Sequence, residues 1–369
     1  MKGGRKIMMK RYFSRFARAS FLLFILSALV YMLALNSPAF ADLINSTVAV
    51  AVRAVLSYIT YLIPFSFFEL LIILVPLILV IAIVVFIKGG KSRGGRIRCI
   101  TSLLALISLL LSSYVFTLGV GYKTTALSKK IDVEDRPDFT AYELYDTTLT
   151  VIGEINALAD KLDSNNGETV MQYSINDLSD RLVDAFDTMN ERYSLLTNYT
   201  SRVKPVYYST VMSDLGISGI YSFFTGEANV NVEYPDYCIP FTAAHEMAHQ
   251  RGIARENEAN FVAFLVCISS EDDYIRYSGY LNLYEYLASA LYRTDEELYR
   301  NARASLSDVA KSDMRASSAV YNLHKDSVLG KINERLNDAY LKANGTEGVV
   351  SYGYVVRLAV GYYQSENNK

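Results

Sequence analysis

The stretch FTAAHEMAHQRG, residues 241–252, predicts a short apolar helix that presents two histidines on one face. His245 and His249 are four residues apart, and positions i and i+4 of a helix share a side, so both imidazoles can reach one metal ion. Glu246 lies beside such an ion, where its carboxylate can take a proton from a metal-bound water and hand it to a leaving amine. Gly252 is expected to end the helix.

A third ligand is needed, because a catalytic zinc ion normally takes three protein ligands and keeps a fourth position for water. A second helix is predicted from about Ala254, with Glu256 and Glu258 near its start. These carboxylates are about 200° apart around the helix, so only one can face the ion. The face of Glu256 continues through small or polar residues that suit close packing on the first helix, whereas Glu258 shares its face with core residues. We expect Glu256 to be the ligand, with Glu258 as the alternative, and Asn260 to hydrogen-bond a ligating histidine.

Histidine is rare in this chain, and its rarity bears on the motif. The chain has three histidines among 369 residues, and two of them belong to the H-E-x-x-H pattern. A chance occurrence on a surface or core helix is therefore the weaker alternative. We expect a functional Zn²⁺ site.

These residues resemble the site of known metallopeptidases. HEMAH at 245–249, followed by ENEAN at 256–260, is similar to the gluzincin pattern of H-E-x-x-H then E-x-x-x-D. The similarity is greatest to membrane metallopeptidases of the HtpX and CAAX prenyl protease type. The resemblance implies a zincin-like domain in which the metal ligands are His245, His249 and Glu256, the general base is Glu246, and Asn260 stands where those families have aspartate.

Over nearly its whole length the chain also resembles an uncharacterised bacterial family, a domain of unknown function. The resemblance is carried by GISGIYSFFTGEANVN at 216–231, by residues 239–265 around the motif, and by SYGYVVRLAVGYY at 351–363. It implies three N-terminal membrane spans followed by an external H-E-x-x-H domain. It implies no particular substrate.

The charge of the chain divides it into two unlike parts. Residues 1–122 carry 13 basic and 2 acidic side chains and residues 123–369 carry 23 and 36, so the net charge of −2 combines about +11 with −13. The first part contains three uncharged apolar stretches, 19–35, 70–87 and 99–122, each near the length of about 20 residues that crosses a bilayer. The second part is large enough for a soluble core. Its acidity argues against nucleic acid as a partner.

The placement of lysine and arginine predicts the orientation of these spans. Seven basic residues precede the first span and five lie between the second and third, whereas Arg53 is alone between the first and second. We therefore expect a multi-pass cell-membrane protein, surrounded by membrane lipid, with a cytoplasmic N-terminus, a linker over 123–138 and an extracytoplasmic domain over 139–369. Residues 48–64 are expected to form an amphipathic helix at the outer interface. SPAFA at 37–41 leaves signal-peptidase cleavage open without changing this topology.

The outer domain is predicted to be mainly α-helical with a small β-sheet. Apolar periodicity predicts helices, besides the two around the motif, over 139–163, 174–196, 279–302, 314–343 and 351–364. The alternating EANVNVE at 227–233 predicts a half-buried strand, which is either the edge strand of a cleft that pairs with an extended peptide or part of a core sheet. His324, Tyr352 and Tyr354 are candidates to stabilise an oxyanion, each with a purely structural role as the alternative.

Two functions fit this pattern. The first is a membrane-anchored zinc metallopeptidase that cleaves peptide or protein substrates at the cell surface. The second is a non-catalytic membrane-tethered sensor or binding protein that retains the fold. The enzyme is favoured, because a lapsed site is expected to lose Glu246 before its ligands. An intramembrane protease is disfavoured, since the apolar run after the site, 259–268, is too short to span a bilayer.

Overall fold

Four helices in the first third of the chain are long and apolar enough to cross a membrane, which indicates a membrane protein. The computed structural model describes residues 13–89 and 93–367. Within them, the four candidate helices cover Arg15–Asn36, Pro38–Tyr61, Phe67–Lys88 and Gly94–Thr117. The first, third and fourth contain the predicted apolar stretches, except that the fourth ends at Thr117. The basic residues before position 13, and Lys91, lie outside the described residues.

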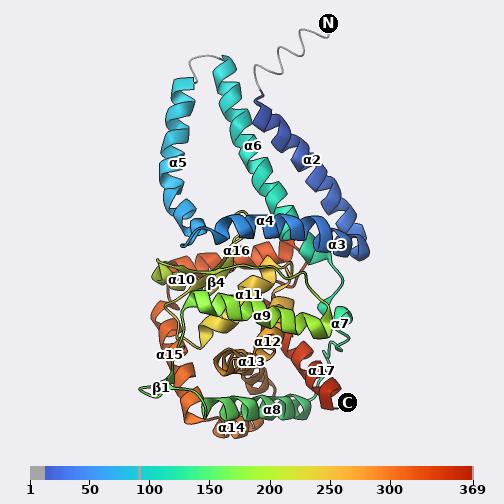
Figure 1. The fold of residues 1–369 in the computed structure, drawn as a ribbon, viewed down its shortest axis with the longest axis vertical. Helices are drawn as coiled ribbons and strands as arrows, with labels where there is room; N and C mark the ends of the chain where they lie inside the picture. The colour runs from blue at the N-terminus through green and yellow to red at the C-terminus, as the bar shows by residue number, and fades with distance from the viewer. Residues whose placement is uncertain (1–12, 90–92, 368–369) are drawn as a thin grey trace.

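Three of these helices extend away from the rest of the molecule, and the remaining one lies across their base (Figure 1). The extended helices are α2 (Arg15–Asn36), α5 (Phe67–Gly89) and α6 (Arg93–Thr117). The crossing segment consists of α3 (Pro38–Ile44), a π-helical turn η1 (Asn45–Ala49) and α4 (Val50–Tyr61). Its position matches the amphipathic helix predicted over 48–64.

The remainder of the chain is mainly helical, as predicted. Its α-helices are α7 (Leu127–Lys130), α8 (Ala141–Ala159), α9 (Ile175–Tyr193), α10 (Ser209–Asp214), α11 (Cys238–Gln250), α12 (Glu256–Ile268), α13 (Asp273–Thr294), α14 (Glu296–Ala304), α15 (Asp308–His324), α16 (Val328–Ala343) and α17 (Val355–Asn367). Two 3₁₀ segments, η2 (Gly119–Lys123) and η3 (Gly348–Tyr354), and a hairpin of β1 (Ser164–Asn165) and β2 (Glu168–Thr169), complete it together with one three-stranded sheet.

Helix α12 lies at the centre of the core. Every residue from Glu258 to Cys267 is buried, as expected for a helix that is apolar on almost all sides. It packs against α11, α13, α9 and α17. Leu127 and Val133, from the segment predicted as a linker, are buried in the same core.

The three-stranded sheet has the order β3-β5-β4. Strand β3 (Val203–Val206) is parallel to β5 (Ala228–Asn231), and β4 (Gly219–Tyr221) is antiparallel to it, with Ile220 opposite Asn229. Strand β5 is therefore the central strand, and β4 is an edge strand. The interpretation of 227–233 as the cleft's edge strand is wrong, and the alternative of a core sheet holds.

The prediction that one face of β5 is exposed is also wrong. Glu227, Asn229 and Asn231 are all buried, because their face packs on protein rather than on water. The carboxylate of Glu227 accepts hydrogen bonds from the first backbone N–H groups of α5, at 2.7 and 3.0 Å. The Asn229 side chain accepts one from Ser66, which precedes the same helix. The polar residues of the strand thus attach the sheet to the start of a candidate membrane span.

Two predicted long helices are each divided by a capping residue. The stretch 279–302 forms the end of α13 and most of α14, because Asp295 accepts hydrogen bonds from the backbone of Glu297 and Leu298 and starts a new helix. The stretch 314–343 divides into α15 and α16 in the same way, at the cap Ser327. Apolar periodicity continues across both caps, so it did not reveal them.

The side chain of Arg53, on α4, hydrogen-bonds to backbone carbonyl groups at the C-terminal ends of α3, α6 and α11. Its side chain is 1% exposed, and its guanidinium donates to Asn45 Oδ1 and to the Asn45 carbonyl, both at 2.9 Å. It also donates to the carbonyls of Phe116 and Thr117 at the end of α6, and to that of Arg251 just after α11, at 3.4–3.5 Å. Its charge therefore faces the C-terminal ends of two helices, where the backbone dipoles favour a cation.

We expect Arg53→Met to lower the free energy of unfolding by about 3 kcal/mol, because several buried carbonyl groups lose a charged donor. Thermal unfolding of the full chain in detergent measures this. The matched control is Arg300→Met, since Arg300 is mostly exposed and only pairs with Glu296 one turn away. Arg300→Met is expected to lower the free energy of unfolding by at most about 0.5 kcal/mol. Equal effects of the two substitutions would contradict the role of Arg53.

Candidate metal centre

The H-E-x-x-H residues lie on α11, which is buried along most of its length. Ala243, Ala244 and Ala248 have no exposed surface, and these small side chains let α12 approach closely. The helix ends because Gly252 has a φ of 102°, which only glycine adopts easily. The N–H of Ile253 then bonds back to the carbonyl of Ala248, the pattern of a Schellman turn. This turn reverses the chain and begins α12 beside α11.

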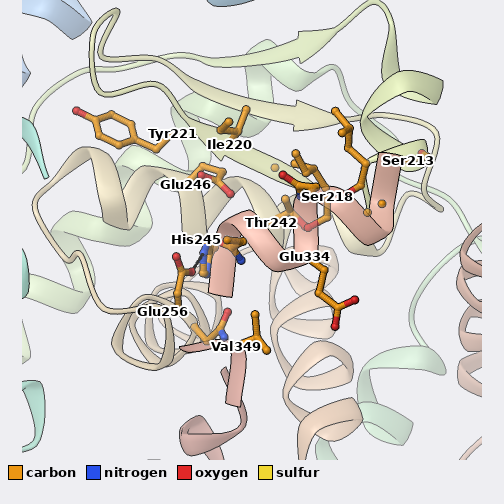
Figure 2. A pocket seen from close by; sticks show the side chains of 18 of the residues that line it. Ser213, Ser218, Ile220, Tyr221, Thr242, His245, Glu246, Glu256, Glu334 and Val349 are labelled. Atoms are coloured by element: carbon orange, nitrogen blue, oxygen red, sulfur yellow. Dashed lines mark hydrogen bonds and ion pairs between the residues drawn. The ribbon is translucent and has the colours of Figure 1, made fainter. Parts of the chain in front are cut away.

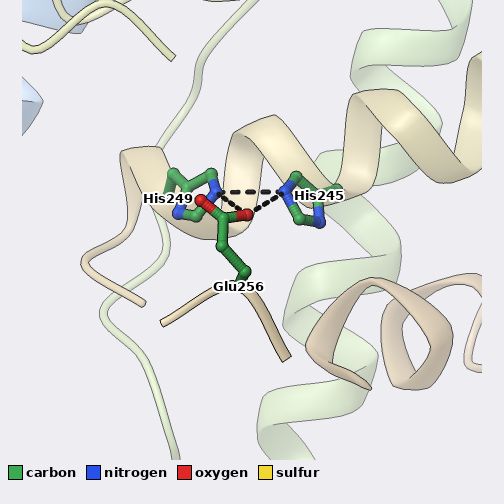
Figure 3. A group of neighbouring side chains, drawn as sticks. All are labelled: His245, His249 and Glu256. Carbon is green, nitrogen blue, oxygen red and sulfur yellow. Dashed lines mark hydrogen bonds and ion pairs between the residues drawn. The ribbon is translucent and has the colours of Figure 1, made fainter. Parts of the chain in front are cut away.

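The turn brings three ligand-type atoms together (Figure 3). The Nε2 atoms of His245 and His249 are 3.0 Å apart. Glu256 Oε2 lies 3.3 Å from the first and 3.4 Å from the second. Two ligand atoms about 2.1 Å from a tetrahedral zinc ion are about 3.4 Å apart, so this spacing suits one ion.

The protonation state of His249 strengthens the fit to a cation. Its Nδ1 atom lies 2.7 Å from the carbonyl oxygen of Ile253, which can only accept, so Nδ1 carries the proton. In a neutral imidazole Nε2 is then an acceptor. The Nε2 lone pair of a neutral His249 and the carboxylate of Glu256 therefore converge beside the Nε2 atom of His245, an arrangement that favours a positive charge between them. Two imidazoles and a carboxylate are a donor set that zinc accepts.

The pKa shifts within the cluster also indicate that a positive charge between the three side chains is favourable. Burial disfavours a charged His249, but the carboxylates of Glu256 and Glu246 and the carbonyl of Ile253 together outweigh burial and raise the pKa of this histidine to about 9. Burial also opposes ionisation of Glu256, yet the two histidines hold its pKa far below the ordinary value. Without a metal ion, a proton would take the position between these groups.

Glu246 lies against the edge strand β4. Its carboxylate accepts a hydrogen bond from the backbone N–H of Tyr221, and burial raises its pKa above the ordinary value. The strand comes so close that a Cβ atom at Gly219 would lie 2.6 Å from Glu246 Oε1 and 2.7 Å from Thr242 Cγ2. Only glycine fits at this point of the strand.

The structure separates the two candidate third ligands as the helical geometry requires. Glu256 faces the histidines, whereas Glu258 is buried elsewhere and accepts hydrogen bonds from Leu127 N and Arg255, both at 2.9 Å. Glu258 therefore has a structural role in fixing the segment after the membrane helices.

Asn260 does not have the position expected of it. The partner that orients His249 is the Ile253 carbonyl, supplied by the turn, rather than the asparagine side chain. The Nδ2 atom of Asn260 is buried without a hydrogen-bond partner among the described residues. The residue lines the cavity beside the cluster.

A cavity of about 890 Å³ opens over the cluster (Figure 2). Side chains from β4, α11, α12, α13 and α16 line it, and it extends to Tyr114 and Leu118 at the end of α6. Tyr286 and Tyr340 also line it, and both lie near enough to Glu256 for its charge to act on their hydroxyls. Sequence reasoning missed them, because they come from helices distant in the sequence and no spacing marks them.

The three proposed oxyanion residues differ in position. His324 lines the cavity, and its Nδ1 atom is 2.8 Å from Asp214 Oδ1, a contact that raises the pKa of His324. Tyr354 is not among the residues that line the cavity, and its hydroxyl bonds to Glu347. The side chain of Tyr352 lies outside the described residues.

Comparisons with known proteins place most of the chain in one group. The model of a family described as "Protein of unknown function (DUF3810)" matches residues 46–360. No curated protein and no solved structure matches the chain. The matched region includes α4, the sheet and the whole candidate metal centre.

We expect Glu256→Gln to abolish stoichiometric zinc in the purified full chain, because an amide replaces the carboxylate whose Oε2 atom lies 3.3 and 3.4 Å from the two histidines. Glu258→Gln is the matched control, since it changes a neighbouring buried carboxylate in the same helix turn. It should retain zinc and lower the thermal midpoint. Elemental analysis of both variants and the wild type measures this. Loss of zinc only in Glu258→Gln would contradict the choice of ligand.

Proposed function

We propose that this chain, which belongs to the DUF3810 family, is a membrane-anchored zinc metallopeptidase of the gluzincin-like kind. The observation that carries the proposal is the convergence of His245, His249 and Glu256 on one point, with Glu246 one residue from the first ligand. Two imidazoles, a carboxylate and an adjacent free carboxylate are the groups that a zinc-dependent hydrolase needs. The cavity above them leaves room for a substrate.

The residues around the cluster suit peptide hydrolysis. Bound at this position, zinc would supply a Lewis acid that makes water a nucleophile near neutral pH. Glu246 takes the proton from the attacking water and delivers it to the nitrogen of the leaving amine. Its raised pKa, caused by burial, suits a group that must both accept and release a proton. Ile253 holds the ring of His249 with its Nε2 atom directed at the metal position.

An extended peptide has a strand to pair with in β4. In an antiparallel pair the backbone groups of alternate residues point to opposite edges. Ser218 and Ser222 bond to the side of β5, so the backbone groups of Gly219 point to the free edge. That edge lines the cavity next to Glu246. We infer that substrate pairs with β4, and not with the strand at 227–233.

The topology belongs to the same proposal. We infer that α2, α5 and α6 span the membrane and that α4 lies at the interface, which the arrangement in Figure 1 supports. Arg15 and Lys88 lie on these helices towards the ends that are distant from the mainly helical part. Under the positive-inside rule these ends are cytoplasmic and the metal centre is extracytoplasmic. Substrates are then peptides or proteins at the cell surface.

The decisive comparison is between His245→Ala and Glu246→Gln in the full chain. We expect the first to lose both zinc and hydrolysis, because it removes a ligand. The second should keep zinc and lose at least about 100-fold in cleavage rate, the usual contribution of a general base. Elemental analysis and a library of fluorescence-quenched peptides measure the two properties. Glu191→Gln on the exposed side of α9 is the matched control and should change neither.

The same experiment separates the enzyme from its alternative. Wild-type protein that binds zinc and cleaves none of the peptides would favour a sensor or binding protein. Wild-type protein that binds no zinc would refute the metal centre itself.

A further inference from the structure

Helix α16 carries a largely exposed apolar stripe of four residues, one of which, Leu336, also borders the cavity. Val328, Leu329, Ile332 and Leu336 are 71%, 49%, 50% and 65% exposed. At 100° per residue these four positions lie within about 100° of one another, so they form one continuous face. The opposite side of the helix points inward, where Asn333 and Asn337 line the cavity and Leu341 is buried.

The helix lies level with the ends of the candidate spans. At its C-terminal end, Tyr340 packs edge-on against Tyr114 of α6, and the Tyr114 hydroxyl donates to Asn344. In its N-terminal half, the Asn333 side chain donates to the carbonyl of Leu215, just after α10. Helix α16 therefore runs from the end of α6 to the neighbourhood of α10.

Helix α10 is in turn attached to α5. The carboxylate of Glu69, in the first turn of α5, accepts hydrogen bonds from the N–H groups of Tyr207 and Tyr208, directly before α10. Both tyrosines are exposed. The two ends of α16 are thus linked to the near ends of two candidate spans. In Figure 1 α16 lies just below α4, at the end of the mainly helical part that faces α2, α5 and α6.

We propose that α16 is a membrane-surface helix whose apolar stripe lies in the outer boundary of the bilayer that α2, α5 and α6 cross. An amphipathic helix in this position buries its apolar face about 5–10 Å into the headgroup and acyl boundary. Lys331 and Arg335 are exposed beside the stripe, where they can reach lipid phosphates. Exposed tyrosines before α10 suit the same interface.

Lipid is the occupant that the observations favour. A contiguous exposed apolar face is unfavourable in water and marks an interaction surface. This face lies at the level where the spans leave the mainly helical part, so the bilayer that surrounds the spans reaches it without another partner. The inference rests on the proposed membrane spans and is independent of the metal centre.

The absence of tryptophan from the chain makes a direct test possible, because one introduced indole is the only one. We consider Ile332→Trp in the full chain, reconstituted in phosphatidylcholine vesicles with and without brominated acyl chains. The expected result is blue-shifted emission, with loss of intensity in the brominated vesicles. Val328→Trp, at a more exposed position of the same stripe that does not border the cavity, replaces it if the first variant does not fold.

Two control variants show how an indole responds to the quenchers inside the bilayer and in water. Leu79→Trp, in the middle of α5, should also be quenched by brominated chains. Tyr142→Trp, on α8 at the far end of the molecule, should be quenched by aqueous acrylamide and not by the lipid. Zinc content, measured on the same samples, reports separately on the metal centre.

Each other outcome overturns the proposal. An indole at position 332 or 328 that behaves like that at 142 places α16 in water. Protection from acrylamide without quenching by lipid places a protein partner or a second copy of this chain on the stripe. Failure of quenching at 79 refutes the spans, and the membrane position of α16 with them.

Discussion

The turn over residues 251–255 is the constraint on which the site and its attachment to the membrane helices both depend. Within five residues the chain leaves α11, reverses and enters α12, and the reversal brings Glu256 to the two histidines. The carbonyl of Ile253 orients His249. The same turn contacts the first third of the chain, because Asn45 donates to the carbonyl of Gly252 and Arg53 to that of Arg251. A displacement of the membrane-proximal helices would therefore reach the candidate metal ligands through these two side-chain contacts to the backbone of the turn.

Charged side chains at helix ends join the two parts of the molecule. Lys204 of β3 is buried and donates to the carbonyls of Thr60 and Ile63 at the end of α4, where the helix dipole is negative. Glu227 accepts from the first N–H groups of α5, where the dipole is positive. Arg53 follows the same rule at α6 and α11. Each charge satisfies backbone groups that helix ends leave unpaired, so a polar interface is stable beside the membrane.

The sequence predicted the parts of the site that lie close together in the chain. The i and i+4 spacing of the histidines, the stop at Gly252 and the 200° between Glu256 and Glu258 depend on helix geometry alone, and the structure has all three arrangements. The predictions that were wrong concern features that depend on tertiary packing. The alternation over 227–233 indicates a strand, but it does not tell whether water or another polar surface meets its Glu227 and Asn229 face. The partner of His249 is a backbone carbonyl, which no residue type reveals.

Helix α16 illustrates a further limit of periodicity, since the same apolar stripe is produced by packing on a core and by lying on a bilayer. A stripe of leucine, isoleucine and valine at helical spacing normally faces inward. Here the side that borders the cavity is mostly polar, because the cavity holds ionised groups, and the apolar stripe is mostly exposed, with Leu336 at the boundary between the two. Two constraints therefore act on α16. The face towards the cavity must be mostly polar, and the surroundings of the opposite face must accommodate exposed leucine and isoleucine side chains. A contiguous apolar face is unfavourable in water, whereas the boundary of a membrane at the level of the span ends accommodates it.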